Sequence, residues 1–303
     1  MRVFQFLILT ISLFLVSSCG PTKDNGKITI VTTTGIVGDC VRAIVGDKAE
    51  VISLMGAGVD PHLYKASQGD ISKLSSADII VYSGLHLEGK MAQMLENYGK
   101  QKAAFAVGNY VTKSELKQVD ATSNLVDPHI WFNPKLWMEG LQGVAQELDK
   151  IEGLQGTAER FYSYKAEVEA LAVKLNQEMD SSLTQPGQRI LITSHDAFEY
   201  FGDAFKFKVR GLQGISTAAE YGAKDVKDLI DFIVENNIKS VFIETSVSDK
   251  NLKSVIEGAK ARGYDLKIGG TLYSDALGEE GTPAGTYQGM LQANVNTIMG
   301  GLK

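Results

Sequence analysis

The chain has 303 residues, of which 44% are hydrophobic and 22% are charged, a composition typical of a globular protein with a sizeable core. At about 100–200 residues per domain, this length predicts two domains or one large one. The formal net charge is −6 and no block of lysine and arginine stands out, which argues against a nucleic-acid partner. Two cysteines are too few for a disulfide framework, so stability must come from the core.

The N-terminus predicts export. After a positively charged start, residues 3–16 form an apolar run that is shorter than the roughly 20 residues needed to cross a bilayer. Residues 1–18 are therefore interpreted as a secretory signal peptide rather than as a transmembrane anchor. The sequence Val16-Ser17-Ser18-Cys19 resembles a lipobox, in which cleavage leaves Cys19 to be lipidated. We expect a protein of the periplasm or outer cell surface, attached to the membrane through Cys19 and a flexible tether over residues 19–26.

Residues 27–155 alternate short, apolar, β-rich runs with segments of helical spacing. Strand-like runs occupy residues 27–34, 50–54, 78–82 and 103–107. Helical spacing occupies residues 36–45, 67–77 and 88–98. Because strands and helices in alternation are typical of parallel sheets with crossover helices, this region is predicted to be an N-terminal α/β lobe.

Residues 186–303 repeat the scheme and are predicted to be a C-terminal α/β lobe. The strand-like runs here are residues 189–193, 208–209, 240–244 and 266–268. Helical spacing occupies residues 225–236, 249–262 and 285–299.

The segment between the lobes, residues 156–185, predicts one long connecting helix. Apolar residues recur at steps of three and four over residues 157–183, with no glycine or proline among them: Phe161, Tyr164, Val168, Leu171, Leu175, Met179 and Leu183. At 1.5 Å per residue this stretch makes a rod of about 40 Å, which Pro186-Gly187 would end. Two packed helices with an unrecognised turn between them are the alternative.

The four histidines suggest where the chemistry lies. Both His62 and His129 end an Asp-Pro-His tripeptide, in which proline restrains the backbone that presents the ring. His195 directly follows the strand-like run 189–193, and Asp275 follows the last strand-like run. Ligands of open α/β sheets gather outside the carboxyl ends of the strands.

Two of these four residues precede the connecting helix and two follow it, so they can meet only at a cleft between the lobes. Imidazole nitrogens and a carboxylate oxygen are good donors for first-row metals. Three histidines and one aspartate would form a closed set of ligands, which suits holding a metal rather than activating water on it.

The sequence around these residues resembles the metal-binding lipoproteins of zinc and manganese ABC importers, and in particular the TroA-like members of that cluster of periplasmic binding proteins. The matching stretches are residues 55–64, 84–88, 127–134, 194–201 and 269–276. The resemblance implies that His62, His129, His195 and Asp275 are the metal ligands. It also implies two α/β lobes bridged by one long helix.

The same resemblance implies that the cargo is Zn²⁺ or Mn²⁺ and that the partner is an ABC permease membrane subunit with its cytoplasmic ATPase. We further expect a monomer and no enzymatic activity. Three imidazoles with one carboxylate suit zinc, whereas a second carboxylate would favour manganese. A metal-stabilised surface adhesin is one alternative, and a zinc hydrolase is another, although the sequence lacks the His-Glu-x-x-His helix of many such enzymes.

Four neighbouring residues receive secondary interpretations. His86 matches a family position that is not a ligand and is interpreted as a surface or helix-start residue. Trp131 is expected to pack beside the site. Asp196 and Glu244 are candidates to accept the second ring N–H of a ligand histidine. For Glu244, which ends a predicted strand, a simple salt bridge is the alternative.

Overall fold

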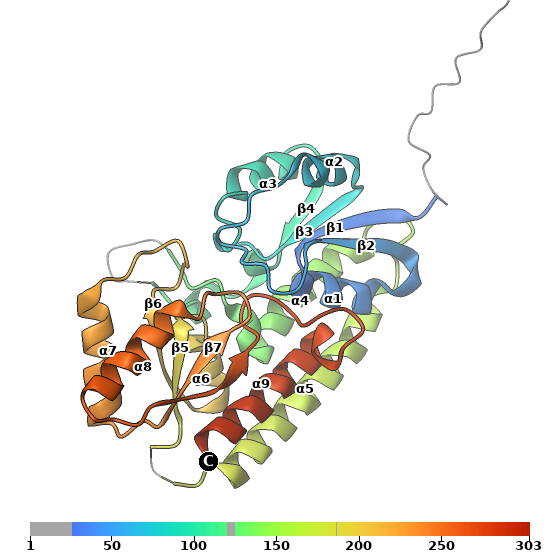
Figure 1. The fold of residues 1–303 in the computed structure, drawn as a ribbon. Coiled ribbons are helices and arrows are strands. Elements are labelled where there is room, and N and C mark those ends of the chain that lie inside the picture. Colours follow the sequence, from blue (N-terminus) through green and yellow to red (C-terminus); the bar gives the residue numbers. More distant parts are fainter. Residues whose placement is uncertain (1–25, 120–124, 186) are drawn as a thin grey trace, which may run out of the picture.

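The computed structural model describes residues 26–119, 125–185 and 187–303. Two α/β lobes lie beside each other, and one long helix runs past both (Figure 1). The predicted signal peptide, the lipobox with Cys19 and most of the tether lie outside the described residues. Among the described residues, no helix combines the length and the apolar character needed to cross a membrane.

The N-terminal lobe is built on a four-stranded sheet in which all neighbouring strands are parallel, in the order β2-β1-β3-β4. Its strands are β1 (Ile28–Thr34), β2 (Ala49–Met55), β3 (Ile79–Tyr82) and β4 (Ala103–Ala106). Its helices are α1 (Gly35–Val45), α2 (Gln68–Ser76), α3 (Ala92–Gly99) and α4 (Pro134–Asp149).

The C-terminal lobe repeats this topology with the order β6-β5-β7-β8, again parallel throughout. Its strands are β5 (Ile190–His195), β6 (Lys208–Gln213), β7 (Ser240–Glu244) and β8 (Lys267–Leu272). Its helices are α6 (Glu199–Phe205), α7 (Ala223–Glu235), α8 (Lys250–Ala261) and α9 (Tyr287–Leu302). The predicted fold class, two α/β lobes with parallel sheets, is confirmed.

Strands β6 and β8 extend furthest beyond the predicted runs, and the cause is glycine. The predictions of 208–209 and 266–268 were too short, because Gly211 in β6 and Gly269-Gly270 in β8 interrupt the apolar pattern. Gly211 is required there, since a Cβ would lie 2.5 Å from the backbone nitrogen of Asp196. A glycine that permits such a close contact interrupts the apolar pattern of the strand, so the sequence there resembles a turn.

Helix α4 was not predicted at all, although its start carries a clear signal. Asn133 caps the helix by accepting hydrogen bonds from the N–H groups of Lys135 and Leu136, and Pro134 occupies the first helical position. The helix then buries one apolar face against the core.

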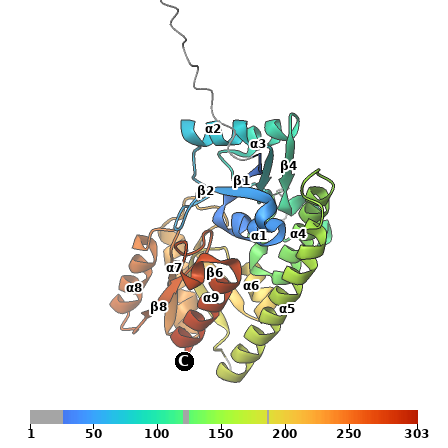
Figure 2. The same ribbon diagram turned by 90° about the vertical axis from the view of Figure 1, so that its right-hand side faces the viewer.

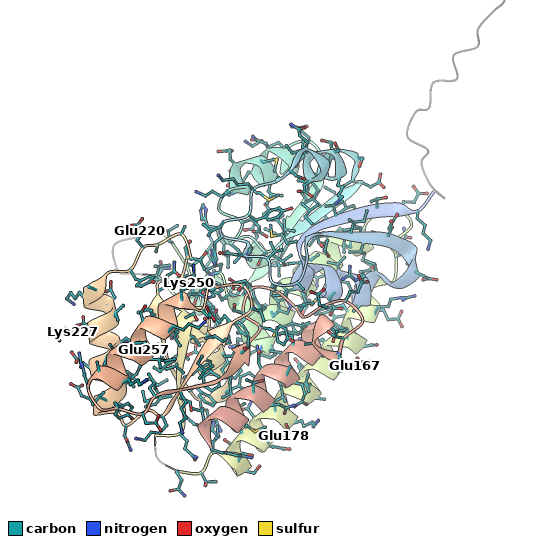
Figure 3. The ribbon with its side chains drawn as sticks, in the orientation of Figure 1. Glu167, Glu178, Glu220, Lys227, Lys250 and Glu257 are labelled. Carbon is teal, nitrogen blue, oxygen red and sulfur yellow. The ribbon has the colours of Figure 1, made fainter. Side chains whose placement is uncertain are left out.

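Helix α5 (Thr157–Ser182) is continuous, so the alternative of two packed helices is wrong. It contacts α1 and α4 of one lobe and α9 of the other, as Figure 2 shows. The apolar stripe predicted from the sequence faces inward, with Phe161, Val168, Leu175 and Met179 buried. The opposite face carries charged residues such as Glu167, at the edge of the molecule (Figure 3).

One hydrophobic core continues across the boundary between the lobes. It joins Val41 and Trp137 of the N-terminal lobe to Leu291 and Val295 of the C-terminal lobe through the buried face of α5. Helix α9 also reaches the opposite lobe, because the backbone N–H of Tyr287 donates to Asp39 at 2.8 Å. A dense shared core resists wide opening, so the lobes are held near one relative arrangement.

This shared core predicts that Leu175→Ala destabilises the whole chain. Leu175 has no exposed surface, and its truncation should lower the free energy of unfolding by about 2–5 kcal/mol. Chemical denaturation followed by circular dichroism measures the change. The control is Val173→Ala on the same helix, at a side chain that is 58% exposed and should change stability by less than about 0.5 kcal/mol. Equal losses for the two variants would contradict the proposed packing of α5.

Candidate metal centre

The four residues singled out in the sequence meet between the lobes. His62, His129, His195 and Asp275 each offer one donor atom, and these atoms all lie within 4.8 Å of one another. His195 ends β5, and Asp275 lies three residues beyond the end of β8. His62 and His129 come from loops that follow β2 and β4. Each lobe therefore contributes two side chains, from the carboxyl ends of its strands.

The spacing of the donor atoms fits one small cation. The Nε2 atoms of His62 and His129 are 3.3 Å apart, and Asp275 lies 3.5 Å from His129 Nε2 and 3.3 Å from His195 Nε2. A tetrahedral zinc ion with bonds of about 2.0–2.1 Å separates its ligand atoms by about 3.3 Å. The separation of 4.0 Å between His62 Nε2 and Asp275 Oδ2 is the widest of these contacts.

The four side chains are buried, so a polar atom among them that lacks a hydrogen-bond partner is unusual. All four side chains are at most 4% exposed. Within the described part of the chain, His195 Nε2 and Asp275 Oδ1 are buried without a hydrogen-bond partner. Buried polar atoms are normally satisfied, and a cation placed between these donors would satisfy both.

The repeated Asp-Pro-His tripeptides have a local structural cause. In each, the aspartate carboxylate accepts a hydrogen bond from the backbone N–H of the histidine two residues later. The distances are 2.8 Å for Asp60 and His62 and 2.9 Å for Asp127 and His129. Such turns are formed by aspartate side chains that bond their own backbone two residues on. They fix the loop that presents each imidazole.

Carboxylates also orient two of the three rings. Asp127 accepts a second hydrogen bond from Nδ1 of His129 at 2.7 Å. Glu244, at the end of β7, accepts from the backbone N–H of His195 at 2.9 Å and contacts Nδ1 of the same residue. These contacts place a carboxylate behind each of the two rings and leave Nε2 facing the centre.

The structure places Asp196 differently from Glu244. Among the described residues, no hydrogen bond joins His62, His129 or His195 to the side chain of Asp196. Instead, Asp196 lines a cavity of about 400 Å³ together with Asp127 and Glu199. The carboxylate that contacts His129 is Asp127, which the sequence reasoning missed. Its place in the tripeptide was the available signal.

The ionisation of the site follows from burial and charge. Burial outweighs the attraction of Asp275 and lowers the pKa of His62 to about 4. Burial would also lower the pKa of His129, but the carboxylates of Asp127 and Asp275 outweigh it and raise that pKa to about 9. The pKa of His195 is likewise raised well above its ordinary value, because the charges of Glu244 and Asp275 outweigh burial.

Asp275 carries the negative charge that faces these imidazoles. Burial opposes its charge, yet His195 and His129 hold the pKa of its carboxyl well below the ordinary range. Protons on two imidazoles therefore balance the buried carboxylate when no cation is present. A divalent cation could take over that balancing role.

Trp131 packs beside the site and joins the two lobes. Its ring meets that of His129 edge to face, with centroids 5.2 Å apart. Its indole N–H donates to the carbonyl oxygen of Ser274 at 3.1 Å, next to Asp275. The hydroxyl of Tyr287 donates to the carbonyl oxygen of Trp131 at 2.8 Å. Trp131 thus links His129 of one lobe to the backbone beside Asp275 of the other.

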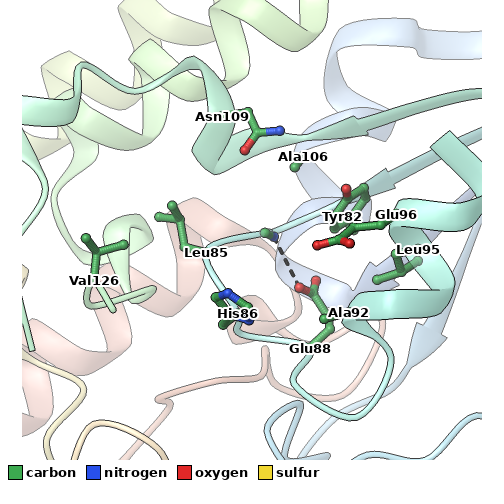
Figure 4. A pocket seen from close by; sticks show the side chains of 11 residues that line it. Tyr82, Leu85, His86, Glu88, Ala92, Leu95, Glu96, Ala106, Asn109 and Val126 are labelled. Carbon is green, nitrogen blue, oxygen red and sulfur yellow. Dashed lines mark hydrogen bonds between the residues drawn. The ribbon is translucent and has the colours of Figure 1, made fainter. Parts of the chain in front are cut away.

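His86 lies apart from the cluster of His62, His129, His195 and Asp275. It is exposed and lines a separate cavity of about 310 Å³ in the N-terminal lobe (Figure 4). Its backbone is left-handed, with φ 64°, as is that of Leu85 before it. The buried carboxylate of Glu88 holds this turn by accepting from the N–H groups of Ser83 and Gly84. His86 is a surface residue and does not begin a helix.

Comparison with known proteins agrees with this fold and site. Residues 30–301 match the ZnuA family, described as zinc-uptake complex component A, periplasmic, and the chain belongs to this family. It is 44% identical over 297 residues to the manganese-binding lipoprotein MntA of Bacillus subtilis (strain 168), covering 96% of each chain. The family resemblance inferred from the sequence is confirmed.

A second relative has a solved structure. The chain is 38% identical over 282 residues to the zinc-binding protein TroA of Treponema pallidum (strain Nichols), covering 92% of this chain and 90% of that one. The structure of the periplasmic zinc binding protein TroA from Treponema pallidum superposes with a TM-score of 0.85, over 91% of this chain and 99% of that chain.

The contact between Asp127 and His129 predicts the effect of Asp127→Asn on the metal-free protein. Removing the charge should lower the pKa of His129 from about 9, because the carboxylate of Asp275 alone then opposes the effect of burial. An NMR titration of the imidazole signals measures this value. Asp196→Asn is the comparison and should change the pKa less. A larger effect of Asp196→Asn would contradict the assignment of Asp127 as the partner of His129.

Proposed function

We propose that this chain is the extracytoplasmic binding component of an ABC importer for a divalent transition metal, zinc or manganese. In this proposal His62, His129, His195 and Asp275 are the metal ligands. The observation that carries it is the convergence of four buried donor atoms, two from each lobe, within 4.8 Å. Membership of the ZnuA family supports transport as the purpose of the site.

The donor set favours zinc in equilibrium binding. Three imidazole nitrogens and one carboxylate suit zinc, and the Irving–Williams order places zinc above manganese at such a site. Both oxygens of Asp275 face imidazoles, Oδ1 toward His129 and Oδ2 toward His195. A bidentate carboxylate would add a fifth donor for a larger ion such as manganese. One relative is named for manganese and the other for zinc, in keeping with a site that accepts either.

The residues around the ligands have supporting roles in the proposal. Glu244 orients His195, and Asp127 orients His129, through the contacts to their Nδ1 atoms. Asp196, beside His195, adds negative charge in the adjoining cavity rather than a hydrogen bond.

Capture and release follow from the layout. A bound cation draws together ligands from both lobes and so stabilises the closed arrangement. The shared core and α5 restrict opening to small tilts and local loop movements. The permease, assembled with its ATPase, would take the metal by favouring the opened arrangement. A lipid on Cys19 would keep the monomeric protein at the periplasmic or outer surface of the membrane beside the permease.

The alternatives receive no support from the comparisons. The relatives described above are a metal-binding lipoprotein and a zinc-binding protein, and neither is named as an adhesin or a hydrolase. Asp275 occupies the position that a hydrolase would keep open for water.

The ligand assignment predicts that His129→Ala weakens zinc binding by at least about 100-fold, since one of four direct donors is lost. Competition with a chelator of known affinity measures the dissociation constant. Circular dichroism and thermal unfolding confirm that the variant is folded. His86→Ala is the matched control, because that imidazole is exposed and lies outside the site. An unchanged affinity in folded His129→Ala would exclude this set of ligands.

The ionisation of the site predicts that zinc binding tightens as the pH rises from 7 toward 9. His129, with a pKa of about 9, and His195, with a pKa raised well above its ordinary value, hold protons that the metal must displace. For each proton that the metal displaces, the zinc association constant rises about tenfold per unit of pH, as long as the pH is below the pKa of that group. His62, with a pKa of about 4, contributes no such dependence in this range.

Isothermal titration in buffers of different ionisation enthalpy counts the released protons directly. Between one and two protons per zinc ion are expected at pH 7. Zinc binding that releases no protons and is independent of pH over this range would contradict the charge balance described for the site.

A further inference from the structure

The three histidines are held unequally. His129 and His195 each have a carboxylate against Nδ1, from Asp127 and Glu244. Among the described residues, the only carboxylate within ion-pair distance of His62 is Asp275, at the metal-facing Nε2. His62 is also the most exposed of the four side chains, at 4%. The position of His62 therefore depends chiefly on its own backbone.

That backbone is held from the opposite lobe. The carboxylate of Asp60 accepts the N–H of His62 with Oδ1, at 2.8 Å, and accepts the hydroxyl of Thr217 with Oδ2, at 2.6 Å. Thr217 belongs to the C-terminal lobe and is 9% exposed. The Asp60 carboxylate thus connects a hydroxyl of one lobe to the backbone of a ligand in the other.

The loop that carries Thr217 is itself anchored beside another ligand. It follows β6, and the last residue of that strand, Gln213, pairs in register with His195. The side-chain amide of Gln213 donates to the carbonyl oxygens of Thr217, at 2.5 Å, and Ala219, at 2.8 Å. A continuous chain of hydrogen bonds therefore runs from Gln213 on β6, the strand next to that of His195, across the lobe boundary to the backbone of His62.

From this arrangement we infer that Thr217 is a positioning residue that sets the rate of metal release. The inference rests on the proposed metal-binding function. Because His62 lacks a carboxylate behind its ring, it is the ligand that leaves first. Its departure requires the loop of Asp60 to move away from Thr217. The hydrogen bond from the Thr217 hydroxyl to Asp60, here called the latch, joins the two lobes and does not involve the metal.

The experiment is zinc release from the full chain, measured by stopped flow. Zinc-loaded protein is mixed with excess 4-(2-pyridylazo)resorcinol, whose absorbance reports free zinc. Thr217→Val removes the hydroxyl and keeps the shape, and should speed release roughly 10–100-fold, as expected for loss of a hydrogen bond to a charged group. The rate of zinc association should change by less than about threefold, since the ligands remain in place.

Two further variants separate the latch from a general effect on the loop. Thr217→Ser restores the hydroxyl and should return release to the rate of the unmodified chain. Ser216→Ala changes the neighbouring hydroxyl, which does not reach Asp60 in the described structure, and should also leave release unchanged. Thr217→Ala replaces Thr217→Val if circular dichroism shows that the valine variant is unfolded.

The outcomes distinguish this inference from the proposed function. Zinc bound at one ion per chain but released equally fast by the unmodified chain and by folded Thr217→Val would overturn the latch and leave the proposed function standing. Equal acceleration in Thr217→Ser and Thr217→Val would also overturn it. An unmodified chain that binds no zinc would overturn the proposed function and this inference with it.

Discussion

A carboxylate that is removed from water and surrounded by three imidazoles is the constraint on which the rest of the structure depends. Asp275 is 1% exposed, and a charge buried in this way is costly unless cations or hydrogen bonds compensate it. His129 and His195 compensate it as imidazolium groups and hold the pKa of Asp275 low. Their own pKa values are raised by Asp127 and Glu244, respectively, together with Asp275. In the proposed function, a metal ion and these protons compete for the same negative charge.

The architecture keeps this competition in place. The two sheets have the same topology, and the carboxyl ends of their strands face the boundary between the lobes. Neither lobe alone contains more than two of the side chains of His62, His129, His195 and Asp275. A single core passes from lobe to lobe through α5 and holds the two pairs of donor atoms near each other. Trp131 and Thr217 add direct hydrogen bonds across the boundary, to Ser274 and Asp60.

Much of this could be predicted from the sequence, for physical reasons. Alternating strand and helix patterns gave both lobes, and an uninterrupted apolar stripe gave α5, because periodicity directly reports burial. The ends of β6 and β8 were missed where glycines make room for neighbouring atoms, the backbone of Asp196 at Gly211 and the side chains of Phe242 and Thr297 at Gly269 and Gly270. The family resemblance, rather than spacing, pointed to the four converging residues. The contact of Asp127 with His129 is local, and the tripeptide was its only signal in the sequence. The contact of Thr217 with Asp60 depends on lobe packing, which no local pattern encodes.

The central claim is that distant side chains of both lobes hold one cation together. A crystal structure of the zinc-loaded chain, with anomalous difference maps recorded on both sides of the zinc absorption edge, tests it most directly. The account predicts one strong peak per chain, about 2.0–2.2 Å from the Nε2 atoms of all three histidines and from a carboxylate oxygen of Asp275. A peak bound by residues of one lobe only, or no peak between the lobes, would contradict it.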